Sequence, residues 1–92
     1  MRFNPGQVVV TRGVNDLIAI NKEFAKFVYL SISRHVAGDW GDACEEDRAS
    51  NDLALKEGDR LLSVYVKEGL PKIWVITEWD RSVTTALLPE EY

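Results

Sequence analysis

Hydrophobic side chains repeat with two different periods along this chain, and the change between them limits the fold more than any other feature. From residue 22 to 37 they recur at helical spacing and form one broad apolar face. After residue 58 they alternate over short runs, which is typical of strands at 60–66, 72–78 and 83–88. The run 72–78 is apolar on both faces, which predicts a central strand.

The first twenty residues supply another strand and a short helix. The β-branched run 7–11 predicts a strand that ends at Arg12. Asn15 or Asp16 can then cap a short helix that continues to Ile20.

A third helix is predicted over 43–56 and ends at Gly58, although its apolar face is weak and the polar stretch 50–52 could break it. The predicted order is β-α-α-α-β-β-β. Tight turns join the last three strands as an antiparallel meander, and no linker or repeat divides the chain. We expect one α+β domain over 1–92, with helices packed on one face of a three- or four-stranded antiparallel sheet.

The formal charge is −4, because fifteen Asp and Glu residues outnumber eleven Lys and Arg residues. A basic footprint is missing, so we do not expect direct binding to nucleic acid. An acidic surface can meet a basic partner, or imitate nucleic acid towards a protein that binds it. It can equally serve solubility alone, and both interpretations stay open.

The chain carries features of a cytoplasmic protein. Its one cysteine, Cys44, excludes an internal disulfide, so no oxidising compartment is implied. The apolar run near the N-terminus is too short for a signal peptide. No segment reaches the roughly 18–20 apolar residues of a membrane span, so we expect no membrane contact.

The stretch RHVAGDWGDACEED, residues 34–47, crowds five carboxylates, a histidine, a tryptophan and the cysteine together. Asp42 stands where the N-cap of the third helix belongs, and Glu45 follows three residues later, as in a capping box. Acidic residues in a first helical turn also interact favourably with the helix dipole. Trp40 is expected to pin the loop to the core. Helix termination thus explains most of the stretch without any chemistry.

The same stretch could alternatively hold a metal ion or a reactive thiol. The candidate ligands for an ion are His35, Asp39, Asp42 and Cys44. Their spacing matches neither the paired Cys and His ligands of structural zinc sites nor an EF-hand loop, so we expect no metal and no cofactor. Cys44 near a helix start could pair with His35 as a nucleophile, but no third group is marked to orient them.

His35 falls in the middle of the apolar face of the second helix. A histidine there is most often a neutral, hydrogen-bonded core residue. The alternative is a catalytic or binding role, because histidine has the only side chain whose unperturbed pKa lets it act as acid and base near neutrality.

A second polar cluster, TEWDRSVTT, spans residues 77–85. Side chains around such a turn commonly bond local backbone groups, and alternate threonines are ordinary on an exposed sheet face. The functional alternative is an oxyanion- or phosphate-binding face made by Arg81 or Arg60 with the hydroxyls of Thr77, Ser82, Thr84 or Thr85. Trp79, if exposed at the turn, would anchor a partner.

Through RHVAGDWGD, RLLSVY and KIWVITEWDRSVTTALLPEEY, the chain resembles a family of short bacterial proteins described as plasmid-related. The resemblance covers residues 30–92 and implies an origin on plasmids, phages or other mobile elements, but it carries over no active site. Trp79 stands where the family pattern has a small residue and Arg12 where it has proline, so local surface details differ.

A looser similarity links the predicted layout to the barnase- and RelE-like ribonuclease fold of toxins. In those enzymes a helix-borne histidine and sheet-borne Arg, Ser or Thr act on the RNA phosphodiester. The similarity implies His35 as general base and Arg60 on the phosphate, with Thr77 and Thr84 beside them. The acidic balance of the chain counts against an RNA substrate.

Three functions are therefore carried as alternatives. The first is a non-catalytic interaction module of a mobile element that binds a basic or nucleic-acid-binding protein, including an inhibitor of host defence of the anti-CRISPR kind. The second is a ribonuclease toxin, and the third is an oligomeric accessory protein that dimerises through its last strand. For the first, the expected contact residues are Asp39, Trp40, Asp42, Glu46, Trp79, Asp80 and Arg81.

Overall fold

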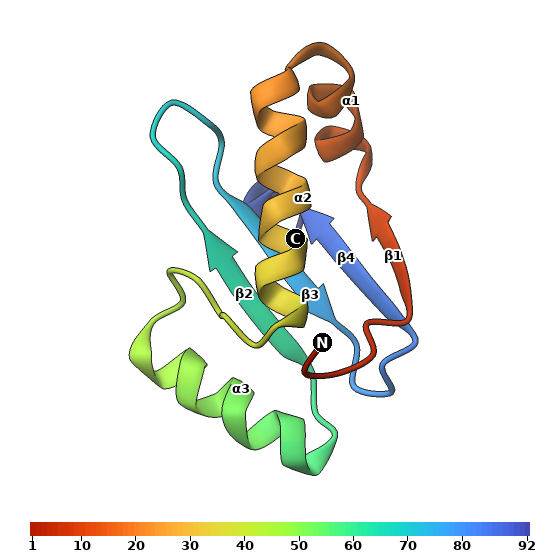
Figure 1. Cartoon of the computed structure of the whole chain (residues 1–92), viewed down its shortest axis with the longest axis vertical. Coiled ribbons are helices and arrows are strands. Elements are labelled where there is room, and N and C mark those ends of the chain that lie inside the picture. Colours follow the sequence, from red (N-terminus) through yellow and green to blue (C-terminus); the bar gives the residue numbers. More distant parts are fainter.

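The computed structural model describes all 92 residues and places helix α2 across one face of a four-stranded sheet (Figure 1). The elements are β1 (Gln7–Val10), α1 (Arg12–Ile20), α2 (Lys22–Val36), α3 (Glu45–Glu57), β2 (Leu61–Tyr65), β3 (Ile73–Thr77), β4 (Val83–Leu87) and the 3₁₀ turn η1 (Pro89–Glu91). The predicted α+β class and element order are confirmed. None of the helices combines the length and apolar character that crossing a bilayer requires.

The strand order is β1-β4-β3-β2, with β2, β3 and β4 in the expected antiparallel meander and β3 in a central position. β1 pairs with β4 in parallel, with Gln7 opposite Val83, so the sheet as a whole is mixed. A parallel pair needs a long crossover, which the intervening helices and strands supply. Since β4 has a neighbour on each side, it offers no free edge to which a strand of a second copy could pair, which counts against the alternative of dimerisation through the last strand.

The apolar face of α2 packs on one side of the sheet. Phe24 and Val28 of α2 share a buried cluster with Tyr65, Ile73 and Val75, whose side chains all point to this side because strand residues alternate between faces. The helical pattern at 22–37 is therefore the pattern of the sheet-facing side of α2. No α-helix packs on the opposite sheet face, and α3 lies beside β2 instead (Figure 1).

Helix α1 begins earlier than predicted. It starts at Arg12, where the sequence was expected only to end the strand, and its N-cap is Thr11 rather than Asn15 or Asp16. The carboxylate of Glu91 bonds the Thr11 hydroxyl at 2.5 Å and the Gly13 N–H at 2.9 Å. An acceptor from the far end of the chain thus satisfies the first turn of the helix, and local sequence does not show this.

The outer edge of β2 is closed to foreign strands. Asn51 on α3 accepts from Leu62 N at 3.1 Å and donates to Leu62 O at 2.6 Å, as a neighbouring strand would. Two residues along, Val64 N donates to Trp40 O at 3.3 Å, and Val64 O accepts from Asp42 N at 2.6 Å. The backbone groups that make an edge strand prone to aggregation are satisfied here.

Helix α3 runs without a break, so the polar stretch 50–52 does not interrupt it. The side-chain amide of Asn51 hydrogen-bonds the backbone of Leu62 in β2, so this polar residue has a partner outside the helix. Asn51 and Ala54 are the only buried residues of α3. Gly58 ends the helix in the left-handed conformation, as predicted.

Gly41 lets the loop before α3 run directly against β2. Its φ is +67°, and a Cβ at this position would lie 2.2 Å from Val64 O. Gly69 has a similar φ of +83°, but nothing lies within 4 Å of its Cβ position. We expect Gly69→Ala to lower the free energy of unfolding by about 1–2 kcal/mol, from backbone strain alone. Gly41→Ala is expected to cost about 2 kcal/mol more, because the loop must also move.

Urea unfolding of both variants beside the wild type measures this difference. Both glycines have a positive φ, so equal losses of stability would contradict the role given to the contact between Gly41 and β2.

Candidate functional site

His35 lies at the centre of a buried chain of hydroxyl groups. Its Nδ1 is 2.6 Å from Ser63 Oγ, and its Nε2 is 2.8 Å from Thr77 Oγ1. Thr77 Oγ1 is in turn 2.7 Å from Thr84 Oγ1, which donates to Pro5 O at 2.7 Å. No buried side-chain nitrogen or oxygen is left without a partner.

The hydroxyl chain determines which nitrogen of His35 carries the proton. Thr84 spends its proton on Pro5 O, so Thr77 must donate to Thr84 and accept from His35 Nε2–H. Nδ1 is then the acceptor for Ser63. A proton added to Nδ1 would remove that acceptor, so the chain favours the neutral imidazole.

Burial lowers the pKa of His35 to about 4, and the nearby charge of Arg81 adds to this effect. The side chain is fully buried, and both ring nitrogens are occupied. The expectation that His35 is a buried, hydrogen-bonded core residue is confirmed, and the lowered pKa favours its neutral form.

The four residues of the ribonuclease hypothesis do not share a cleft. His35, Thr77 and Thr84 meet in the buried chain, but Arg60 is on the other side of the sheet. There its Nη1 donates to the Tyr92 hydroxyl at 2.7 Å, and its guanidinium carbon lies 5.1 Å from the Tyr92 ring centroid. The imidazole and the Arg60 guanidinium therefore cannot act on one phosphate in this structure.

The polar side chains of the loop before α3 form hydrogen bonds and an ion pair within the protein. Asp39 forms an ion pair of 2.7 Å with Arg34 and accepts from Gly41 N at 3.0 Å. The hydrogen bond from Arg34 lowers the pKa of Asp39. Trp40 is buried, as expected of a plug, and its Nε1 donates to Asp52 at 3.0 Å. Asp39 and Trp40 thus each have a structural role in the fold, although the Asp39 side chain stays 51% exposed.

The capping box predicted at Asp42 is wrong. The N-cap of α3 is Cys44, and no side chain caps the helix there. The carboxylate of Asp42 instead accepts from Val66 N at 3.1 Å, which extends the closed edge of β2. Long-range pairing therefore wins over the local capping pattern. Nowhere do three His, Cys, Asp or Glu side chains approach one another as ligands of an ion.

Arg81 clamps the β3–β4 turn to the C-terminal end of α3. It adopts a φ of +60°, and its guanidinium donates to four carbonyl oxygens: Asp59 at 2.6 Å, Ala54 at 3.0 Å, Glu78 at 3.1 Å and Trp79 at 3.3 Å. A non-glycine residue in this region is strained, and these bonds hold it there. Both terminal nitrogens of Arg81 are therefore used within the fold.

Asp80 accepts from Ser82 N at 3.0 Å, and the hydrogen bonds from Ser82 lower the pKa of this carboxyl. The turn is thus braced from both sides. Trp79 lies in this turn and is 66% exposed, which meets the condition set for it as an anchor for a partner.

Helix α3 is exposed over most of its surface. It carries five carboxylates against two basic residues, and Leu53 is 55% exposed among them. Arg81 joins the end of this helix to the Trp79 turn. We name the exposed parts of both the α3–turn surface, which includes Glu45, Glu46, Leu53, Glu57, Asp59, Trp79 and Asp80.

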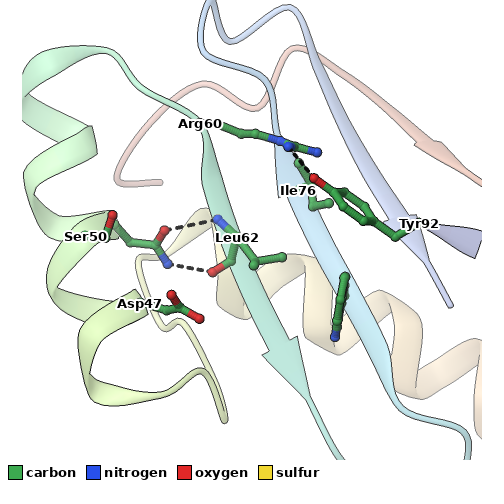
Figure 2. A pocket seen from close by; sticks show the side chains of 8 residues that line it. Asp47, Ser50, Arg60, Leu62, Ile76 and Tyr92 are labelled. Carbon is green, nitrogen blue, oxygen red and sulfur yellow. Dashed lines mark hydrogen bonds between the residues drawn. The ribbon is translucent and has the colours of Figure 1, made fainter. Parts of the chain in front are cut away.

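A groove of about 340 Å³ lies between α3 and the sheet face opposite α2 (Figure 2). Sequence reasoning missed it, apart from Arg60. Because side chains alternate along β3, Trp74 points to the sheet face away from that of Val75. This alternation was the available sign that Trp74 lies on the face without α2. The meeting of Tyr92 with Arg60 joins distant parts of the chain and had no local signal. The lining residues are Asp47, Ser50, Asn51, Arg60, Leu62, Trp74, Ile76 and Tyr92.

Comparison with models of protein families, with curated proteins and with solved structures gave no match to this chain. The resemblances to plasmid-related bacterial proteins and to ribonuclease toxins stay predictions. The functional argument therefore depends on the geometry of the chain itself.

The stability of the protein should depend on pH through His35. An unfolded histidine takes up a proton below a pKa of about 6.5, whereas folded His35 does so only near 4. The unfolded state therefore binds more protons between these values, and stability falls as the pH falls. We expect a loss on the order of 2 kcal/mol between pH 7 and pH 5, measured by urea unfolding.

His35→Gln supplies the control, because an amide keeps polar atoms in the chain but does not titrate; its stability should change far less over the same range. Direct NMR titration of the imidazole covers the case in which this variant does not fold. An imidazole that titrates near pH 6.5 in the folded protein would overturn the prediction.

Proposed function

We propose that this protein is a non-catalytic interaction module that binds a basic protein in the cytoplasm through the α3–turn surface. The observation that carries this proposal is the exposure of Trp79, at 66%, on a turn that Arg81 bonds to the acidic helix α3. Exposed tryptophans within a polar surround are typical centres of protein interfaces. A turn already held in place also loses little entropy on binding.

The charge of α3 supports a basic partner. Glu45, Glu46 and Asp47 are exposed in its first turn, where the helix dipole favours them, and no ion pair engages them. Such a surface raises the association rate of a positively charged protein, particularly at low salt. A protein that binds nucleic acid has the matching charge.

The biological setting we propose follows from the resemblance to plasmid-related proteins. A mobile element gains from disabling host defence, and many defence proteins bind nucleic acid. An acidic module that occupies such a protein, as anti-CRISPR inhibitors do, fits both the resemblance and the charge. Of the seven contact residues expected from sequence, the proposal keeps Glu46, Trp79 and Asp80, and gives the other four structural roles.

Capture from a bacterial lysate with the tagged protein tests the proposal. We expect one basic partner that is lost as salt rises and is retained by Tyr29→Ala, since Tyr29 is an equally exposed aromatic residue on α2, at 70%. Trp79→Ala should weaken binding by about 30-fold, the effect of an interface residue worth about 2 kcal/mol.

Two results would contradict the proposal. One is a partner that binds Trp79→Ala and Tyr29→Ala equally well. The other is RNA cleavage by the purified protein that disappears in His35→Ala, which would restore the ribonuclease alternative.

A further inference from the structure

The groove beside α3 has an apolar floor between two different rims. Figure 2 shows Leu62 and Ile76 on the sheet, Asp47 and Ser50 on the α3 side, and Arg60 with Tyr92 at the opposite end. At about 340 Å³ it reaches the lower end of the roughly 300–1,000 Å³ typical of ligand pockets.

The floor exists because no α-helix packs on this face of the sheet: Leu62 is partly exposed, and Ile76 lies at the base of the groove with 4% exposure. Leu62 and Ile76 are paired across β2 and β3 and point away from α2. Trp74 and Tyr92 form an aromatic wall, with ring centroids 5.5 Å apart in an edge-to-face arrangement. An apolar chain laid over this floor would be shielded from water on several sides.

The two rims differ in how far their polar groups are already used. Arg60 donates to the Tyr92 hydroxyl, stacks on its ring, and lies 4.0 Å from the Glu78 carboxylate. Asp47 and Ser50, in contrast, take part in no hydrogen bond or ion pair through their side chains. The unused polar groups are therefore an acceptor carboxylate and a hydroxyl on the acidic helix.

We propose that this groove receives one long basic side chain, lysine or arginine, of the partner protein. Its methylene stem would cover Leu62 above the buried Ile76, and its charged head would reach Asp47 and Ser50, beside the face of Trp74. Basic side chains combine an apolar stem and a cationic head in this way, and aromatic rings attract the cation. The inference depends on the proposed function, because it names the chemistry of the same basic partner.

An anionic ligand fits the groove less well. The only cation in its lining is Arg60, which already has Tyr92 and Glu78 as partners, whereas three carboxylates occupy the first turn of α3. Electrostatic complementarity therefore favours a cation at the α3 rim.

NMR titration of the full chain with acetyl-Gly-Arg-Gly-amide tests the groove without knowledge of the partner. We expect saturable shifts of the Trp74 indole N–H and of the Leu62 and Ile76 methyl groups. Asp47→Asn should weaken the interaction roughly three- to fivefold, as loss of an exposed ion pair does. Asp16→Asn is the matched control, since Asp16 is an exposed aspartate on α1, and it should change nothing.

The inference is overturned if the groove signals do not respond, or if acetyl-Gly-Glu-Gly-amide binds there and Arg60→Gln abolishes that binding. These failures differ from failure of the proposed function. A partner that needs Trp79 while the groove signals stay unchanged would leave the interaction module standing and remove only the groove. If the groove binds the basic peptide but the captured partner binds Trp79→Ala as well as the wild type, the groove stands and the proposed role of the α3–turn surface is wrong.

Discussion

The hydrogen-bonded chain through His35 is the interaction on which the rest of the structure depends. It joins α2 to β2, β3 and β4 at one point, and it extends to the backbone at Pro5. His35, Thr77 and Thr84 each donate one hydrogen bond and accept one within the chain, and the carbonyl of Pro5 only accepts, so the chain is satisfied in a single direction. An apolar core tolerates small shifts of a helix on a sheet, but a buried chain of this kind does not, because a broken link leaves a polar group unpaired. The position of α2 thereby determines which sheet face is covered and which remains open.

Helix α3 obeys a different constraint. It buries only Asn51 and Ala54, so little hydrophobic free energy holds it against the sheet. Its attachments are polar and specific: the amide of Asn51 on β2, the indole of Trp40 on Asp52, and Arg81 at its final carbonyl groups. A helix that is polar almost all round needs such attachments to remain ordered. The result is an acidic helix held in a fixed place with most of its surface in water.

Local sequence predicted those features that depend on local periodicity. The apolar face at 22–37 and the alternation after residue 58 gave α2 and the three C-terminal strands with boundaries close to those observed. The errors occur where a distant group decides. Asp42 matched a capping pattern but bonds Val66 across the β2 edge, and α1 begins early because Glu91 completes its first turn.

The candidate site shows the same division. The ribonuclease hypothesis grouped His35, Thr77 and Thr84, which do lie close together, but the sheet separates them from Arg60. The alternation of side chains along β2 gives the reason. Leu61 points to the face covered by α2, so Arg60, which precedes it, points to the open face. Sequence could indicate which residue types were present, but their chemistry depended on which face each one reached. Burial made the histidine structural, while the same alternation left the groove uncovered.

The Arg81 clamp connects the two surfaces assigned to a partner. The Arg81 guanidinium donates to the carbonyl of Asp59, which precedes Arg60 at one end of the groove, and to the carbonyl of Glu78, whose carboxylate lies 4.0 Å from Arg60. The Trp79 turn and the groove are therefore parts of one braced region and not independent loops. A partner that contacts both would find them already ordered, so its binding free energy would not be spent on arranging them. This role explains why a strained residue is kept at the turn. The left-handed backbone conformation of Arg81 is costly by itself, but the arginine side chain bonds both the turn and α3, which glycine could not do.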